Sequence, residues 1–156
     1  MKHFLTSLLA VALCVACQPA NPIRDAMEQY AKEHIENPDT FKYEYMGIEK
    51  EYTYFNDLVQ YRLGLQKLAE KAEDKSEYLA EDDRIQPLFE KYGTQVACRE
   101  YSLYFHTLGG SSGKMQFPGV VLARYDADGK LMEMTLDPDS LPTYPALQML
   151  RDRGEL

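Results

Sequence analysis

Ser111 lies in a string that could belong to a serine hydrolase. It is the middle residue of Gly109-Gly110-Ser111-Ser112-Gly113, which matches the G-x-S-x-G pattern of a nucleophile elbow. An elbow requires a strand-to-helix turn and a histidine later in the chain, whereas this string separates two expected strands and the last histidine is His106. We therefore expect a hairpin loop and no catalytic residue here, and we keep a hydrolase that uses Ser111 or Cys98 as an alternative.

Residues with metal-binding or phosphate-binding chemistry are isolated in the sequence. Beyond residue 16 the histidines are His34 and His106, and neither has the H-x-x-x-H or cysteine-rich spacing of a metal site. Asp126-x-Asp128-Gly129 is similar to the start of a calcium loop, but Lys130 takes the position of the third ligand, so we interpret it as a hairpin turn. Gly113-Lys114 lacks the spacing of a phosphate loop. We expect no metal and no cofactor.

The N-terminal residues have the pattern of an export signal. Met1-Lys2-His3 is a basic start, and residues 4–15 form an apolar run that is too short to span a bilayer, which takes about 20 residues. The run ends in Leu13-Cys14-Val15-Ala16-Cys17, which resembles a lipobox except that Cys14 stands where leucine is usual. We predict a lipoprotein signal peptide over residues 1–16.

Cys17 is the residue that we expect to carry acyl chains such as palmitate. Residues 17–22 would then form a lipidated tether between the membrane and a single domain over residues 23–156. A plain secretory signal, cut near Ala16 or Ala20, is the alternative interpretation.

Cys98 would be the one free thiol of the mature chain, because the signal removes Cys14 and lipidation blocks Cys17. No internal disulfide could form. Cys98 lies in a run of alternating apolar residues, and free cysteines are among the most buried residue types. We expect a structural thiol inside a strand.

The charge of the chain argues against nucleic acid as a partner. The formal net charge is −8, and loss of Lys2 with the signal leaves −9. A nucleic-acid-binding protein needs a basic patch, but the cations here alternate with acids, as in Glu49-Lys50-Glu51. An acidic domain gains no attraction to anionic lipid, so we expect membrane attachment to come from the acyl chains.

Hydrophobic periodicity predicts an α+β fold. A 3.6-residue period predicts helices and a two-residue period predicts strands. We expect a first helix over 23–35, a long strand over 40–54 with a bulge at Gly47, helical segments over 56–92 with a kink or restart at Pro87, strands over 94–107, 115–125 and 131–136, and a short helix over 146–152.

The order of these elements predicts an antiparallel sheet of about four strands with the N-terminal helix packed on one face. We expect a cystatin-like arrangement with a helical hairpin inserted between the first and second strands. Gln95-Val96-Ala97 is similar to part of the cystatin inhibitory loop, so a protease-inhibitor-like module is a further alternative.

Two short motifs resemble those of small bacterial lipoproteins, many of the Bacteroidota type. The first is Asn37-Pro38-Asp39-Thr40-Phe41, at the exit of a helix and before a Tyr-rich strand. The second combines Cys98-Arg99-Glu100-Tyr101 with the Gly109-Gly110 turn, where relatives show a Tyr-Arg pair and a Gly-Gly hairpin. The resemblance implies a lipid anchor and an antiparallel sheet, and it implies no activity.

Tyrosine is the most distinctive residue type, with twelve in the chain. The two-residue period places Tyr43 and Tyr45 on one side of the strand expected over 40–54. Tyrosine rings can fill a core or form a face that binds protein or stacks on sugar. We favour the core for most of these rings. Where the first helix covers one face of the sheet, the alternative hypothesis is that the other face exposes aromatic rings as a contact surface. The hypothesis is a non-enzymatic binding or accessory lipoprotein of the cell envelope, on the periplasmic face of the outer membrane, with an envelope protein or glycan as partner.

Overall fold

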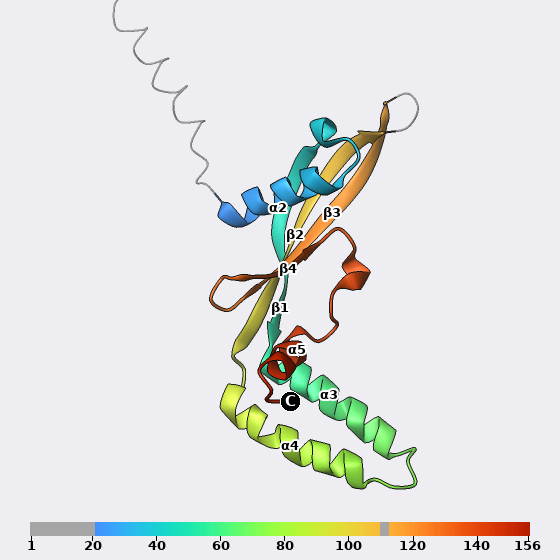
Figure 1. Cartoon of the computed structure of the whole chain (residues 1–156), viewed down its shortest axis with the longest axis vertical. Helices are drawn as coiled ribbons and strands as arrows, with labels where there is room; N and C mark the ends of the chain where they lie inside the picture. Colours follow the sequence, from blue (N-terminus) through green and yellow to red (C-terminus); the bar gives the residue numbers. More distant parts are fainter. Residues whose placement is uncertain (1–20, 110–112) are drawn as a thin grey trace, which may run out of the picture.

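The chain folds into an α+β structure with a four-stranded antiparallel sheet, as predicted (Figure 1). The computed structural model describes residues 21–109 and 113–156, so Cys17 and Ser111 lie outside the described residues. The sheet order is β1-β2-β3-β4. The elements are α2 (Pro22–His34), η1 (Pro38–Thr40), β1 (Lys42–Thr53), α3 (Tyr54–Ala69), α4 (Ser76–Tyr92), β2 (Val96–Gly109), β3 (Met115–Asp126), β4 (Leu131–Thr135), η2 (Pro138–Ser140) and α5 (Pro145–Asp152).

Helix α2 lies across one face of the sheet, at the end far from α3 and α4 (Figure 1). It begins where the sequence predicted, because the Asn21 side chain accepts a hydrogen bond from the Arg24 N–H at 3.2 Å and Pro22 occupies the first turn. Its buried residues are Met27 and Ala31. They pack against β2 and β3 in a core cluster that also contains Leu103, Phe105, Val121, Ala123 and Tyr125.

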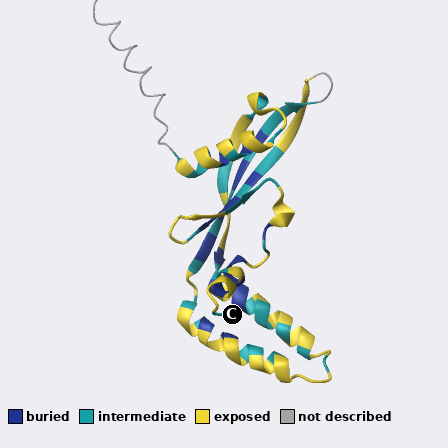
Figure 2. Ribbon diagram, in the orientation of Figure 1, coloured by how far each residue is buried: buried dark blue, intermediate teal, exposed yellow. Residues whose placement is uncertain are grey.

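A second core cluster joins the helices at the opposite end of the molecule (Figure 2). Leu58 of α3, Ile85 of α4 and Leu150 of α5 are fully buried in it, beside Ala97 at the start of β2. The domain therefore has two separate hydrophobic clusters along one long sheet.

Strand β1 differs from the prediction in its end and in its irregularities. Tyr54 begins α3, because the Thr53 side chain caps the helix by accepting from the Asn56 N–H at 3.2 Å. The predicted bulge at Gly47 is wrong. The pairing with β2 shifts instead between Tyr43 and Tyr45, and again between Ile48 and Lys50.

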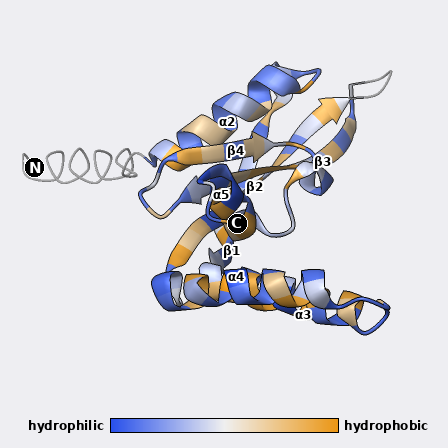
Figure 3. Cartoon of the chain, turned by 60° about the horizontal axis from the view of Figure 1, so that its bottom comes forward, coloured by the Kyte–Doolittle hydropathy of each residue, from blue (hydrophilic) through white to orange (hydrophobic). Residues whose placement is uncertain are grey.

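Helices α3 and α4 follow β1 and form a hairpin that projects from the sheet (Figure 3). Arg62 of α3 and Asp82 of α4 join the two helices by an ion pair of 2.6 Å. Leu68 of α3 is 53% exposed, because in the part of the chain that the structure describes no third layer covers the far half of the hairpin.

Helix α4 is continuous through Pro87, so the expected restart at this residue does not occur. Proline removes one helical hydrogen bond and leaves the carbonyl of Asp83 without its partner. Both residues are exposed, so water can reach that carbonyl. The helix ends at Gly93, whose φ of 50° lies in the left-handed region.

The two faces of the sheet follow from the alternation along β2. Leu103 and Phe105 are buried under α2. Because successive side chains of a strand point to opposite faces, Ser102 and Tyr104 point away from α2. We call the face that carries Tyr104 the open face.

Candidate binding face

We call the end of the open face nearer to α5 its lower part and the end nearer to α2 its upper part. A buried ionic cluster covers the lower part. Arg124 on β3 donates from Nε to Glu100 Oε2 on β2 at 2.8 Å and from Nη2 to the hydroxyl of Tyr52 on β1 at 3.1 Å. Tyr52 in turn donates to Glu100 Oε2 at 3.2 Å. One carboxylate thus accepts two bonds, and the three strands are cross-linked by side chains.

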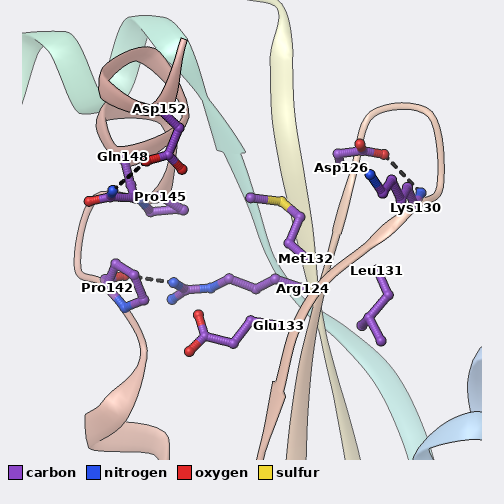
Figure 4. Close-up of a pocket in the computed structure, with 10 residues that line it drawn as sticks. All are labelled: Arg124, Asp126, Lys130, Leu131, Met132, Glu133, Pro142, Pro145, Gln148 and Asp152. Atoms are coloured by element: carbon purple, nitrogen blue, oxygen red, sulfur yellow. Dashed lines mark hydrogen bonds between the residues drawn. The ribbon is translucent and has the colours of Figure 1, made fainter. Parts of the chain in front are cut away.

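Arg124 also joins the sheet to the segment that leads into α5. Its Nη1 donates to the carbonyl oxygen of Pro142 at 2.7 Å (Figure 4). A hollow of about 360 Å³ lies beside this contact, between β4 and α5. Because Glu100, Tyr52 and Pro142 together engage the guanidinium, we assign Arg124 a structural role.

The upper part of the open face carries a stacked pair of tyrosines. The rings of Tyr45 and Tyr104 have their centroids 4.5 Å apart and are inclined by 16°. Tyr45 is 54% exposed. The fold therefore presents an aromatic surface on the face that α2 does not cover.

A bulge in β1 places Tyr45 on the open face. Tyr43 pairs with Phe105 and Tyr45 pairs with Tyr104, so Glu44 is an extra residue between the two pairs. Residues Phe105 and Tyr104 point to opposite faces, and their partners do the same. The expectation that Tyr43 and Tyr45 share one side is therefore wrong.

Glu49 is the charged group beside the aromatic pair. Its Oε1 accepts hydrogen bonds from the Ser102 hydroxyl at 2.6 Å and from the Tyr104 hydroxyl at 2.9 Å. These bonds stabilise the ionised form and lower the pKa of the Glu49 carboxyl below its ordinary value. The same contact raises the pKa of the Tyr104 hydroxyl. The site therefore holds a carboxylate next to an oriented tyrosine ring.

Two adjoining hollows form a groove over Tyr104. The first, of about 360 Å³, is lined by Glu49, Lys50, Glu100, Tyr104, Val120, Leu122 and Pro138. The second, of about 330 Å³, is lined by Tyr104, Pro118, Gly119, Val120 and Leu136. Because the hollows share Tyr104 and Val120, we treat them as one feature and call it the Tyr104 groove.

Cys98 is a buried residue of β2, as the sequence predicted. Burial raises the pKa of its thiol to about 11, so the reactive thiolate is scarce at neutral pH. His106 lies eight residues further along the same strand, or about 26 Å at 3.3 Å per residue. A Cys98 hydrolase needs a histidine within hydrogen-bond reach of the thiol, and His106 does not lie there.

The two histidines lie in separate local contacts. Nδ1 of His34 lies 2.8 Å from the carbonyl oxygen of Tyr30, and Nδ1 of His106 lies 2.8 Å from Oε1 of Glu44. Within residues 21–109 and 113–156, no three His, Cys, Asp or Glu side chains form a group that could hold a metal.

The remaining sequence motifs have structural positions. Asp126 forms the predicted hairpin turn, since its Oδ1 accepts from the backbone N–H of Asp128 at 3.0 Å and of Lys130 at 2.8 Å. Ala97, of the segment similar to the cystatin loop, is buried in β2. Sequence reasoning missed the roles of Glu100, Arg124 and Glu49, although a charged residue between apolar neighbours, as at Arg124, is a usable signal.

Comparison with known proteins gave no match: no family model, no curated protein and no solved structure matches this chain. The described helices include none that is both long and apolar enough to cross a membrane.

Proposed function

We propose that the chain is a non-enzymatic binding module of the cell envelope whose contact surface is the open face. The observation that carries this proposal is the exposed Tyr45–Tyr104 stack beside the Glu49 carboxylate. Aromatic rings contribute large contact areas at binding surfaces, and exposed apolar patches mark interaction sites. The partner would be an envelope protein or a glycan.

We also propose that the module is anchored by lipid. Residues 1–16 would be removed, Cys17 would carry the acyl chains and residues 17–22 would tether the domain to the periplasmic face of the outer membrane. Support comes from the lipobox-like string at Leu13–Cys17 and from the Bacteroidota-type motifs. Intact mass and membrane fractionation of the wild type beside Cys17→Ala test the anchor. Wild-type protein of unmodified mass in the soluble fraction would contradict it.

A photo-crosslinking experiment tests the contact surface. A benzophenone amino acid replaces Tyr45, and in the matched control it replaces Tyr43, which is two residues away on the α2 face and also exposed. We expect cross-linked envelope material from position 45 and much less from position 43. Equal yields from both positions would contradict the proposal.

The finer fold hypothesis is a cystatin-like arrangement in which α3 and α4 are a helical hairpin inserted between the first and second strands. The helix α2 across one face of an antiparallel meander supports it. Deletion of residues 56–92 with a short replacement turn is a direct test, because an inserted hairpin can be removed while the α2 cluster stays folded.

A further inference from the structure

We propose that the Tyr104 groove is a saccharide site that takes a neutral sugar unit, with the apolar face of the sugar on the Tyr104 ring and its hydroxyls on Glu49 and Lys50. The proposal depends on the binding function proposed above and names the ligand class. A pyranose has C–H groups on its faces and hydroxyls around its rim. It therefore needs a flat apolar surface with polar donors and acceptors beside it.

The aromatic surface is held in place before a ligand arrives. Tyr104 is fixed by its hydroxyl bond to Glu49 at 2.9 Å, and it stacks on Tyr45 at 4.5 Å between centroids. Tyr104 remains half-buried and lines both hollows. A prearranged ring costs little conformational entropy when a ligand binds.

The polar groups of the groove suit hydroxyls, which both donate and accept hydrogen bonds. Both bonds to Glu49 end on Oε1, and the described residues give no bond to Oε2. The Lys50 ammonium lies 4.3 Å from the centroid of the Tyr52 ring and has no ion pair within the described ranges. One free acceptor and one free donor group therefore line the same hollow.

The charge of the groove favours a neutral ligand over a charged peptide. Glu49 and Lys50 contribute opposite charges, and the carboxylate of Glu100 is neutralised by Arg124 at 2.8 Å. The lining therefore has no net charge, although the chain as a whole carries −8. Electrostatic attraction steers a charged partner to a site of opposite charge, and the lining of this groove has no net charge that could attract one.

The second hollow extends the site beyond one sugar unit. It continues from Tyr104 past Val120 to Pro118 and Gly119, and its lining residues are uncharged. An oligosaccharide could place one unit against Tyr104 and the next along Val120. We therefore expect trisaccharides to bind more tightly than single sugars.

Saturation-transfer NMR on the full chain, in a detergent without a sugar head group, tests the proposal. The probes are maltotriose, cellotriose and tri-N-acetylchitotriose. We expect saturation to reach the ring C–H protons of at least one of them. Tyr104→Ala should weaken that binding about tenfold, which corresponds to about 1.4 kcal/mol.

Matched controls separate the site from general effects of mutation. Tyr43→Ala removes an exposed tyrosine from the other face and should leave the affinity unchanged. Glu49→Gln should weaken binding, while Glu51→Gln should not, because Glu51 pairs with Arg99 at 2.9 Å outside the groove. Circular dichroism confirms that each variant is folded.

The outcomes separate this inference from the binding function that it depends on. If no trisaccharide receives saturation, or if Tyr104→Ala binds as the wild type does, the saccharide proposal is wrong. Cross-linking of a protein at position 45 in that case would leave the open face as a protein-binding surface. If the protein shows no sugar binding and no selective cross-linking, both proposals are wrong.

Discussion

The two faces of the sheet are closed by different kinds of interaction. The face under α2 is closed by apolar side chains, with Leu103, Val121 and Ala123 fully buried. The lower part of the opposite face is closed by the bonds of Arg124 to Glu100, Tyr52 and Pro142. Its upper part carries the exposed Tyr45–Tyr104 stack.

The difference explains why the binding surface lies where it does. Apolar packing has no directional requirement and favours complete coverage. A buried ion pair must instead be satisfied at fixed atoms, so it holds the segment at Pro142 in one place without spreading over the sheet. The strand residues above it are left free to meet a ligand.

The largest effect is expected from Arg124→Met. This change leaves the carboxylate of Glu100 buried without its cation, which typically costs about 3–5 kcal/mol in the free energy of unfolding. Urea denaturation followed by tyrosine fluorescence measures it. The control Arg99→Met breaks the exposed pair with Glu51 and should cost less than about 1 kcal/mol. Equal losses would show that the cluster does not close the face.

A double variant sharpens this test. Removing both charges, by Arg124→Met with Glu100→Met, leaves no unpaired charge in the sheet. We expect it to be more stable than Arg124→Met alone, because replacing a whole buried ion pair by apolar residues is often neutral. Further loss of stability in the double variant would contradict this account.

Leu103→Ala tests the covered face. Leu103 is fully buried under α2, so truncation leaves a cavity and should cost about 2–5 kcal/mol. Leu122→Ala removes a half-buried leucine from the opposite face and should cost about 1 kcal/mol. Chemical denaturation of both variants gives the comparison, and a larger loss at Leu122 would reverse it.

Gly119→Ala tests how closely the covered face is packed. An added Cβ would lie 2.7 Å and 2.9 Å from two carbons of the Phe105 ring. Overpacking of this kind costs about 1–3 kcal/mol. The control Gly47→Ala places its Cβ where no atom lies within 4 Å, so thermal unfolding should show a much smaller loss there. A smaller loss at Gly119 than at Gly47 would contradict the packing.

Local patterns predicted most of the elements. Asn21 and Pro22 set the start of α2, and the alternation around Cys98 predicted a buried strand. The bulge at Glu44 and the end of β1 at Thr53 were missed, because both depend on pairing with β2 and on a cap rather than on hydrophobic period. The first of these errors placed Tyr43 and Tyr45 on one side.

The site was predicted only as a class of surface. Tyrosine density was compatible with a core or with an exposed aromatic face, and a sequence pattern does not show which tyrosine stacks on which. Glu49 and Glu100 are separated by 51 positions and become neighbours in one groove only through the register of β1 and β2. The partners of Arg124 are equally distant in the chain, so its role could not be assigned beforehand.

The smallest effect is a pH dependence at Asp57, which helps to fix α5 at the lower part of the sheet. Its Oδ2 accepts from the backbone N–H of Ala146 at 2.9 Å, but burial is the larger influence and raises the pKa of the carboxyl. A carboxyl whose pKa is higher in the folded than in the unfolded state contributes stability at pH values below its unfolded-state pKa. This contribution is lost as the pH rises through the folded-state pKa. Asp57→Asn keeps an acceptor and cannot ionise.

We therefore expect Asp57→Asn to gain stability relative to the wild type between about pH 3 and pH 7. Asp74 is the control with the opposite sign, because the Ser76 backbone N–H lowers the pKa of this exposed carboxyl. Asp74→Asn should match the wild type at low pH and fall below it at neutral pH. Urea titrations across this range measure both differences. If both variants change in the same direction, burial is not the main influence on the pKa of Asp57. The Asp57 carboxylate would then act as an ordinary N-terminal cap of α5.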